Sequence, residues 1–161
     1  MEHVIVRRLE HLTGTVEQPA LGYAVEVRDR PGPAFKGGTD PGEVVWVQVH
    51  GGLIVARAEI ELGWVAEYAG IDEVRRQTRG SPLHDIEDFW RGRARVGYAV
   101  VAKLRRERWI EPFWAGPRSY AYEWILLESE KKRSTWVDPR DPPRGGEALR
   151  AAFEAWKRER S

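Results

Sequence analysis

The sequence predicts an α+β fold: a small, mixed, partly closed β-barrel with short helices and a C-terminal helix. Three observations predict it. Residues 43–62 read as two strands joined by a His-Gly-Gly turn, the pattern of a β-hairpin. The strands and helices do not alternate as they do in a doubly wound parallel sheet. Finally, residues 146–160 place Leu149, Phe153 and Trp156 at helical spacing, as in a helix with one apolar face.

Further elements follow from local pattern. Residues 4–6 and 23–27 are short β-rich runs that predict the first two strands, and the Pro- and Gly-rich residues 28–42 predict a loop between strands. In the hairpin's return strand, Ala56, Ala58, Ile60 and Leu62 are expected to share the buried face. Alternate charged residues then face outward, as when one side of a strand is solvated.

The second half of the chain predicts helices before strands. Residues 71–80 and 81–90 are expected to form two short helices, the second opened by a Ser-Pro pair. Residues 96–104 and 120–127 predict two more strands. Residues 109–118, rich in aromatic residues and proline, predict the loop that joins them.

The 161 residues suit one domain with one core. We expect a barrel domain over residues 1–128. Residues 129–161 then form a basic, proline-rich connection and a C-terminal helix that packs on the barrel. The sequence does not indicate an oligomeric state.

Composition excludes several classes of protein. The chain has no cysteine, which excludes disulfides, thiolate nucleophiles and cysteine-bound zinc. No apolar run approaches the roughly 20 residues that span a bilayer, and the N-terminus does not read as a secretory signal, so a cytoplasmic protein without a membrane segment is expected. Absence of asparagine and preference for arginine over lysine favour a thermophilic source, although a GC-rich genome gives a similar bias.

Charge is segregated along the chain although the net charge is only +1. Residues 1–74 carry six basic and twelve acidic side chains, whereas residues 75–108 carry ten basic and four acidic. This basic segment predicts a patch for nucleic-acid phosphates, with Arg75, Arg76 and Arg79 at its start. The alternative is a set of solvated helix faces with ordinary ion pairs.

Residues 40–49 (DPGEVVWVQV) and 52–60 (GLIVARAEI) resemble the paired strands of PUA-like domains, the superfamily that includes the ASCH and EVE domains. The strands at residues 97–101 and 124–127 fit the same pattern, so the resemblance covers about residues 1–128. It implies a small β-barrel. In relatives such as EVE and YTH domains it also implies a pocket at the barrel's end that holds a base between aromatic side chains.

One departure limits what the resemblance implies. ASCH families carry a G-x-K-x-x-E-x-R signature early in the domain. Its nearest counterpart here, residues 14–21 (GTVEQPAL), lacks the lysine, the spaced glutamate and the arginine. The amidohydrolase activity of one ASCH branch relies on that lysine, so we do not expect it here.

Eight tryptophans are more than one small core needs, and indole faces stack well on bases. By the resemblance, Trp64, Trp109 and Trp114 are the expected stacking residues of the pocket. The alternative is that they pack loops against the barrel.

Charged residues near these tryptophans complete the predicted site. Arg118 and Arg57 would contact phosphate or a carbonyl edge, and Glu59 would accept a hydrogen bond from a base amino group. For Arg57 and Glu59 a cross-strand surface salt bridge is the alternative interpretation.

Other chemistry finds little support in the sequence. His84 and Asp88 stand one helical turn apart, but no second histidine is spaced to complete a metal site, so we expect no metal. The glycine-rich residues 37–42 lack the lysine of a phosphate-binding loop. No serine lies in a nucleophile motif. We therefore expect no cofactor and name no catalytic residue.

The sequence thus favours a module that binds RNA or other single-stranded nucleic acid, or a modified or flipped nucleobase. Two alternatives stay open. One is a small enzyme acting on a modified nucleoside, as an ASCH-like amidohydrolase does. The other is a protein-interaction domain whose C-terminal helix docks on a partner.

Overall fold

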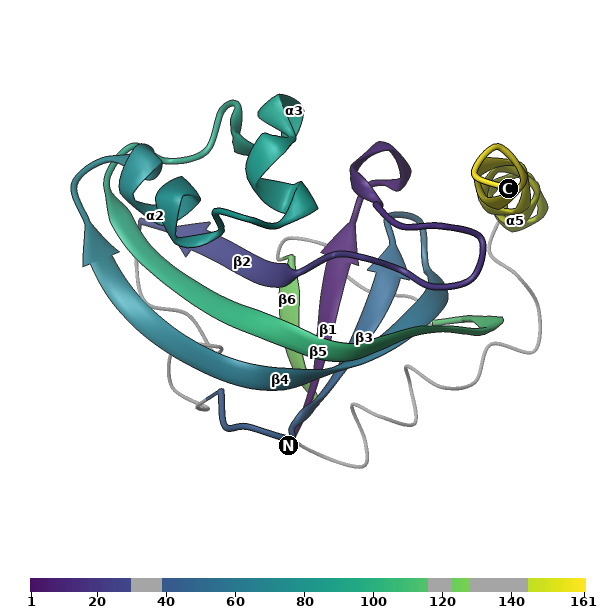
Figure 1. Ribbon diagram of the computed structural model, residues 1–161, viewed down its shortest axis with the longest axis horizontal. Helices are drawn as coiled ribbons and strands as arrows, with labels where there is room; N and C mark the ends of the chain where they lie inside the picture. The colour runs from purple at the N-terminus through teal and green to yellow at the C-terminus, as the bar shows by residue number, and fades with distance from the viewer. Residues whose placement is uncertain (30–38, 116–122, 128–144) are drawn as a thin grey trace.

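A computed structural model describes residues 1–29, 39–115, 123–127 and 145–161. Its centre is a mixed six-stranded sheet that curls into a half-barrel, with short helices over the concave side (Figure 1). The predicted α+β class and partly closed barrel are confirmed. The strands are β1 (Glu2–Arg7), β2 (Tyr23–Arg28), β3 (Val44–Val49), β4 (Leu53–Tyr68), β5 (Gly97–Trp114) and β6 (Trp124–Leu127).

The strand order is β2-β5-β4-β3-β1-β6. β1 runs parallel to β3, and the other pairs are antiparallel. The predicted hairpin is β3 and β4, joined at His50, Gly51 and Gly52. β2 and β6 are the two edges of the sheet. Because these edges do not pair with each other in the described part of the chain, the barrel stays open along one side.

β4 and β5 give the sheet its curl. They are 16 and 18 residues long and pair antiparallel over most of their length. Their register shifts three times, between Ile54 and Ala56, between Arg57 and Glu59, and between Ile60 and Leu62. A register shift of this kind bends a strand and increases its twist. The two long strands can therefore wrap around one core instead of forming a flat sheet.

The expected burial of Leu62 is wrong. Its side chain is 56% exposed, whereas Ala56, Ala58 and Ile60 are fully buried. The register shift between Ile60 and Leu62 interrupts the alternation of faces at this point. The alternation of apolar and polar residues in the sequence cannot predict a register shift, because the shift depends on how β4 pairs with β5.

The expected loop at residues 109–118 is also wrong over its first half, because β5 continues to Trp114. Among the described residues, β5 beyond Lys103 pairs with β4 alone, since β2 covers the stretch from Tyr98 to Lys103. A proline lacks the backbone N–H of a ladder and is tolerated where one side of a strand has no partner. Pro112 lies in this one-sided stretch.

The helices gather at the two ends of the half-barrel. One group, α2 (Ile71–Gln77), the 3-10 turn η2 (Pro82–Asp85) and α3 (Glu87–Trp90), lies on the concave side (Figure 1). A second 3-10 turn, η1 (Leu9–His11), follows β1. The C-terminal helix α5 (Gly146–Arg158) lies apart from them beside the sheet. No helix in the described segments is long and apolar enough to cross a bilayer.

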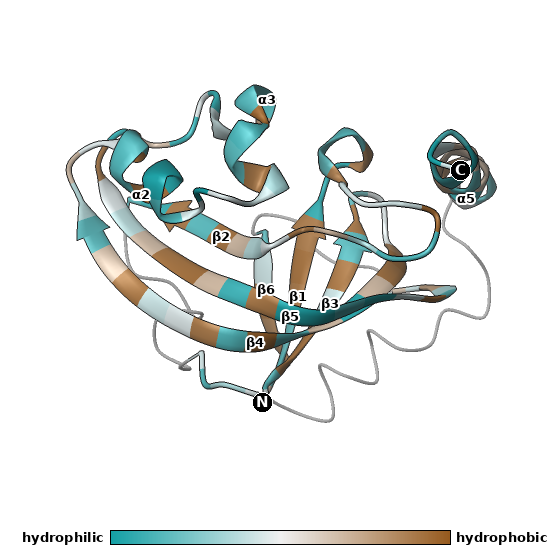
Figure 2. Ribbon diagram, in the orientation of Figure 1, coloured by the Kyte–Doolittle hydropathy of each residue, from teal (hydrophilic) through white to brown (hydrophobic). Residues whose placement is uncertain are grey.

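Helix α5 packs on the barrel through its apolar face. Phe153 and Trp156 belong to the main buried cluster, and Leu149 packs against it. The ring of Trp109 on β5 contacts both aromatic rings, with centroid separations of 5.6 and 5.7 Å. Figure 2 shows the brown, apolar bands of β1 and β3 that form the same core. The apolar face that might have docked on a partner is therefore used within the chain.

Gly97 should tolerate no side chain. Its φ is +148°, and a Cβ atom there would lie 2.2 Å from the backbone oxygen of Arg28. We expect Gly97→Ala to reduce the free energy of unfolding by about 2 kcal/mol or more, measured by urea denaturation. Gly70→Ala is the control, because a Cβ there meets nothing within 4 Å. Equal stability of the two variants would contradict the prediction.

Candidate ligand-binding cleft

A cleft of about 880 Å³ opens where the barrel fails to close. Its walls come from the end of β1, the end of β2, and Glu123 just before β6, so both edges of the sheet contribute. The segment from Asp88 to Ala94 closes another side, and His50 of the hairpin turn completes it. In the described part of the chain, five arginines line the cleft: Arg7, Arg8, Arg28, Arg91 and Arg93.

Arg7 is the most buried cation of the cleft, with 5% of its surface exposed. Its Nη2 donates to the backbone oxygen of Tyr23 at 2.9 Å, which links β1 to β2 across the gap. Its Nη1 is buried and has no hydrogen-bond partner in the described structure. Burial, with the like charge of Arg93, lowers the pKa of Arg7 to about 10, so it stays charged at neutral pH. A buried, charged donor without a partner is a natural anchor for an anion.

Arg93 joins α3 to Glu123, the residue just before β6. Its Nη1 and Nη2 donate to the Glu123 carboxylate at 2.6 and 3.1 Å, and its Nε donates to the Phe89 backbone oxygen at 2.5 Å. The guanidinium lies 3.8 Å from the centre of the Phe89 ring, and that of Arg7 lies 5.5 Å from it. One buried ring thus supports both cations through cation–π contact.

Glu26 and Arg28 form an ion pair that lines the cleft. They share one face of β2, and Nε and Nη2 of Arg28 both donate to Oε1 of Glu26, at 2.8 and 2.6 Å. Glu26 is only 3% exposed, and its Oε2 is buried without a hydrogen-bond partner in the described residues. Burial raises the pKa of Glu26 to about 7, although Arg28 opposes this. Its charge therefore changes near neutral pH.

His11 and Asp88 form a third polar pair. Nε2 of the buried His11 lies 2.7 Å from Oδ2 of Asp88. Glu10 lies close enough that one atom from each of the three residues falls within 4.8 Å of the others. Arg8 and Arg91 each lie 3.9 Å from Asp88 and already balance its charge. This arrangement suits a hydrogen-bonding dyad better than a cation site, because arginines repel a metal ion.

Glu107 fixes the segment that leads into β2. Its two carboxylate oxygens accept hydrogen bonds from the backbone N–H groups of Leu21 and Gly22, at 2.7 and 3.2 Å. Arg106, just before it, has a φ of +52°, at the strongly curved part of β5. Glu107 also interacts electrostatically with Arg7. It holds the segment before β2 in place, next to the point where Arg7 of β1 bonds to Tyr23.

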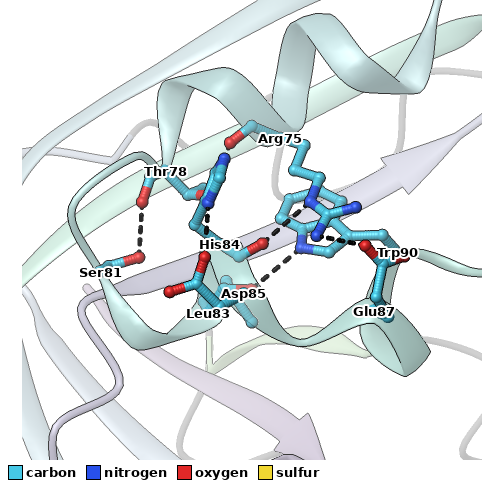
Figure 3. A network of polar contacts seen from close by, with 8 residues as sticks. All are labelled: Arg75, Thr78, Ser81, Leu83, His84, Asp85, Glu87 and Trp90. Atoms are coloured by element: carbon cyan, nitrogen blue, oxygen red, sulfur yellow. Dashed lines mark hydrogen bonds and ion pairs between the residues drawn. The ribbon is translucent and has the colours of Figure 1, made fainter.

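A polar network positions α3 against the cleft (Figure 3). Arg75 of α2 donates to the backbone oxygen of His84 at 2.9 Å and to Glu87 at 2.9 Å. The Trp90 indole donates to the backbone oxygen of Leu83 at 2.9 Å. These bonds tie α2, η2 and α3 together and so fix the segment that carries Asp88 and Phe89. Arg75, one of the predicted phosphate contacts, is occupied in this structural network.

The three predicted stacking tryptophans lie in two places. Trp64 packs in the cluster under α2, where its indole donates to Gln77. Trp109 packs on α5 and donates to the backbone oxygen of Thr15 at 2.9 Å, and Trp114 is buried in the main core, 7% exposed. In the described part of the chain, the cleft lining contains none of the tryptophans predicted to stack on a base, although Arg91 and Arg93 of the predicted basic segment 75–108 line it. Their role in ligand binding stays a prediction.

The predicted charged residues are also spread out. The Arg57 guanidinium lies 5.8 Å from the ring centre of Trp46, and Glu59 lies 3.4 and 3.8 Å from Arg106 and Arg105. The cross-strand ion pair that was the alternative for Glu59 is thus present. Exposed on or just after α2, Arg76 and Arg79 can meet a ligand at the surface. Arg118 lies outside the described residues.

The cleft residues Arg7, His11, Glu26 and Arg28 were not predicted from the sequence, whereas Arg91 and Arg93 belong to the basic segment 75–108 that was expected to contact phosphates. A faint signal exists for two of them, because Glu26 and Arg28 stand two apart on a strand that is otherwise apolar. Both faces of β2 are covered, since Ala24 and Val25 are both buried. Arg7 and Arg93 are far apart in the sequence, and the fold brings both guanidinium groups over the ring of Phe89.

No protein-family model matches the chain, and no curated protein matches it. Among solved structures, the chain is similar to the crystal structure of ASCH from Zymomonas mobilis, with 14% identity, a TM-score of 0.48 and coverage of 85% of this chain and 96% of that one. It is also similar to a mutant of the same protein, with 16% identity, a TM-score of 0.46 and coverage of 84% and 96%.

Glu26 should make stability depend on pH. Its pKa is about 7 in the folded protein, above the ordinary 4.5. Its stabilising contribution is therefore fully present below the lower value and is lost as pH rises through the higher one. Between pH 5 and 8 we expect the native protein to lose about 2 kcal/mol of unfolding free energy that Glu26→Gln does not lose.

Urea denaturation at the two pH values measures this difference. Glu61→Gln, which removes an exposed carboxylate paired with Lys103 on the β4–β5 surface, is the control and should behave as the native protein does. Identical pH dependence in Glu26→Gln and the native protein would show that Glu26 does not titrate in this range.

Proposed function

We propose that this chain is an RNA-binding module and that the cleft holds a nucleotide unit by its phosphate and its base edge. The observation that carries the proposal is Arg7, a buried cation in the cleft whose Nη1 has no partner among the described residues. A charged donor of this kind costs free energy unless a ligand acceptor satisfies it. Phosphate oxygens are strong acceptors for guanidinium donors.

Exposed arginines at the rim of the cleft can contact an extended anionic ligand. The side chains of Arg8 and Arg91 are 63% and 75% exposed, so they can reach a ligand without a large desolvation cost. Arg76 and Arg79 add exposed positive charge on and after α2. A polynucleotide, with one negative charge per nucleotide, fits a buried anchor with a cationic rim better than a small neutral molecule does.

Glu26, which lines the cleft, favours recognition of a base. Oε2 of Glu26, which has no partner among the described residues, can hydrogen-bond to a base edge: it accepts from an N–H group when the carboxyl group is ionised and donates to a carbonyl oxygen when it is protonated. Sequence-specific RNA recognition targets unstacked bases by such edge contacts. This arrangement favours a splayed-out or flipped nucleotide over a paired one. The predicted stacking by Trp64, Trp109 and Trp114 is a separate proposal, because these residues lie outside the cleft lining.

Binding can be tested with a short single-stranded RNA, monitored by tryptophan fluorescence at several salt concentrations. We expect affinity to fall steeply with salt. Arg91→Ala should weaken binding about tenfold at low salt and reduce the slope of log affinity against log salt by about 1. Arg158→Ala, which removes an exposed arginine from α5, is the matched control and should bind as the native protein does.

Arg7→Lys tests the anchor itself. It keeps the charge but removes the planar set of donors, so we expect at least about tenfold weaker binding. Thermal unfolding of this variant checks that its fold is kept. Loss of binding in an Arg76→Ala, Arg79→Ala double variant but not in Arg91→Ala would move the site to α2. No binding by the native protein would refute the proposed function.

A second candidate is an enzyme that hydrolyses a modified nucleoside. One observation favours it: the His11–Asp88 dyad, at 2.7 Å, lies in the same cleft as Glu26, whose pKa is about 7. A histidine oriented by a carboxylate can accept a proton from an attacking water. Release of a base or acyl product from a panel of modified nucleosides, and its loss in His11→Gln, would establish this activity.

A further inference from the structure

Glu26 stands out as a buried carboxylate that the fold does not fully satisfy. Oε1 takes both hydrogen bonds from Arg28, and Oε2 is buried without a partner in the described residues. The side chain lines the cleft on edge strand β2, beside the gap in the barrel. A ligand that enters the cleft therefore comes close to a group that can carry either a negative charge or a proton.

Charges of both signs face Glu26. Arg28 pairs with it on its own strand, while Arg93 and Glu123, from across the cleft, act on it electrostatically. Asp29, Arg7, His11 and His50 line the same cleft. The neighbouring strand β5 offers only apolar side chains at the paired positions, Ala99, Val100 and Val101. The ionised form therefore has one close cationic partner and little water.

A phosphate in the cleft changes this balance. It would bring negative charge beside Arg7 and Arg93, and Arg93 acts electrostatically on Glu26 as well as on Arg7. An ionised Glu26 would repel that charge, and in a site with little water such repulsion is weakly screened. A neutral Glu26 has no charge to repel the phosphate, and its Oε2 can then donate a hydrogen bond to the ligand instead of accepting one.

We propose that Glu26 couples occupancy of the cleft to proton uptake, so that the phosphate-bearing ligand binds to the form in which Glu26 is neutral. This proposal rests on the proposed function. It adds a dependence on pH to that function: the cleft binds RNA more tightly below pH 7 than above it. The pKa of about 7 for Glu26 places the change within the physiological range.

Isothermal titration calorimetry with hexauridylate that has hydroxyl ends tests the coupling. Neither its phosphodiesters nor its uracils titrate between pH 6 and 8, so a proton taken up belongs to the protein. In two buffers of different ionisation enthalpy at pH 7, we expect uptake of about half a proton by the native protein. Affinity should be about tenfold weaker at pH 8 than at pH 6, because less of the neutral form is present.

Glu26→Gln mimics the neutral carboxyl group and should bind with no proton uptake and with equal affinity at both pH values. Glu61→Gln, on the β4–β5 surface, should keep both native effects. Proton uptake that persists in Glu26→Gln and disappears in His11→Gln would assign the proton to His11 and overturn the proposal.

The measurement on the native protein does not depend on any variant. Binding at pH 6 with equal affinity at pH 8 and no proton uptake would refute the coupling and leave RNA binding intact. Absence of binding at every pH would refute the proposed function, and the coupling with it.

Discussion

The structure depends on a sheet that curls but does not close. In the described part of the chain, β2 and β6 are edges that do not pair with each other, and buried side chains line the gap. Arg7 links β1 to the start of β2, and Arg93 links α3 to the residue before β6. Guanidinium groups suit this role because they present several donors in one plane. The side of the barrel that would otherwise be a continuous wall becomes a charged cleft.

Lining the open side with charged side chains leaves some of their buried polar atoms without partners. Nη1 of Arg7 and Oε2 of Glu26 are buried without partners in the described structure. Unsatisfied buried polar atoms reduce stability, and proteins tolerate them mainly where function uses them. The rest of the region is tightly held, since Phe89 supports both Arg7 and Arg93 and Glu107 fixes the start of β2. Within the described residues, Gln48, Arg105 and Trp156 also bury polar atoms without partners, but only the unsatisfied atoms of Arg7 and Glu26 belong to residues that line the cleft.

The long strands and the short helices make this arrangement possible together. Register shifts bend β4 and β5, so that the sheet has a concave side over which α2 and α3 can lie. Arg75 and the Trp90 indole tie these helices to each other and to η2 (Figure 3). On the other side, α5 covers the main core with Phe153 and Trp156. In the part of the chain that the structure describes, helices cover both ends of the half-barrel, and the cleft lies at the open side.

The sequence by itself determined the fold class, the β3–β4 hairpin and the apolar face of α5, because each depends on a local periodicity of apolar residues. It did not determine where β5 ends or that Leu62 faces outward, because these depend on strand pairing and register. The cleft was decided only by the tertiary structure. Arg7, Glu26 and Arg93 come from three distant segments, and what makes them a site is burial and mutual distance, which no local pattern encodes.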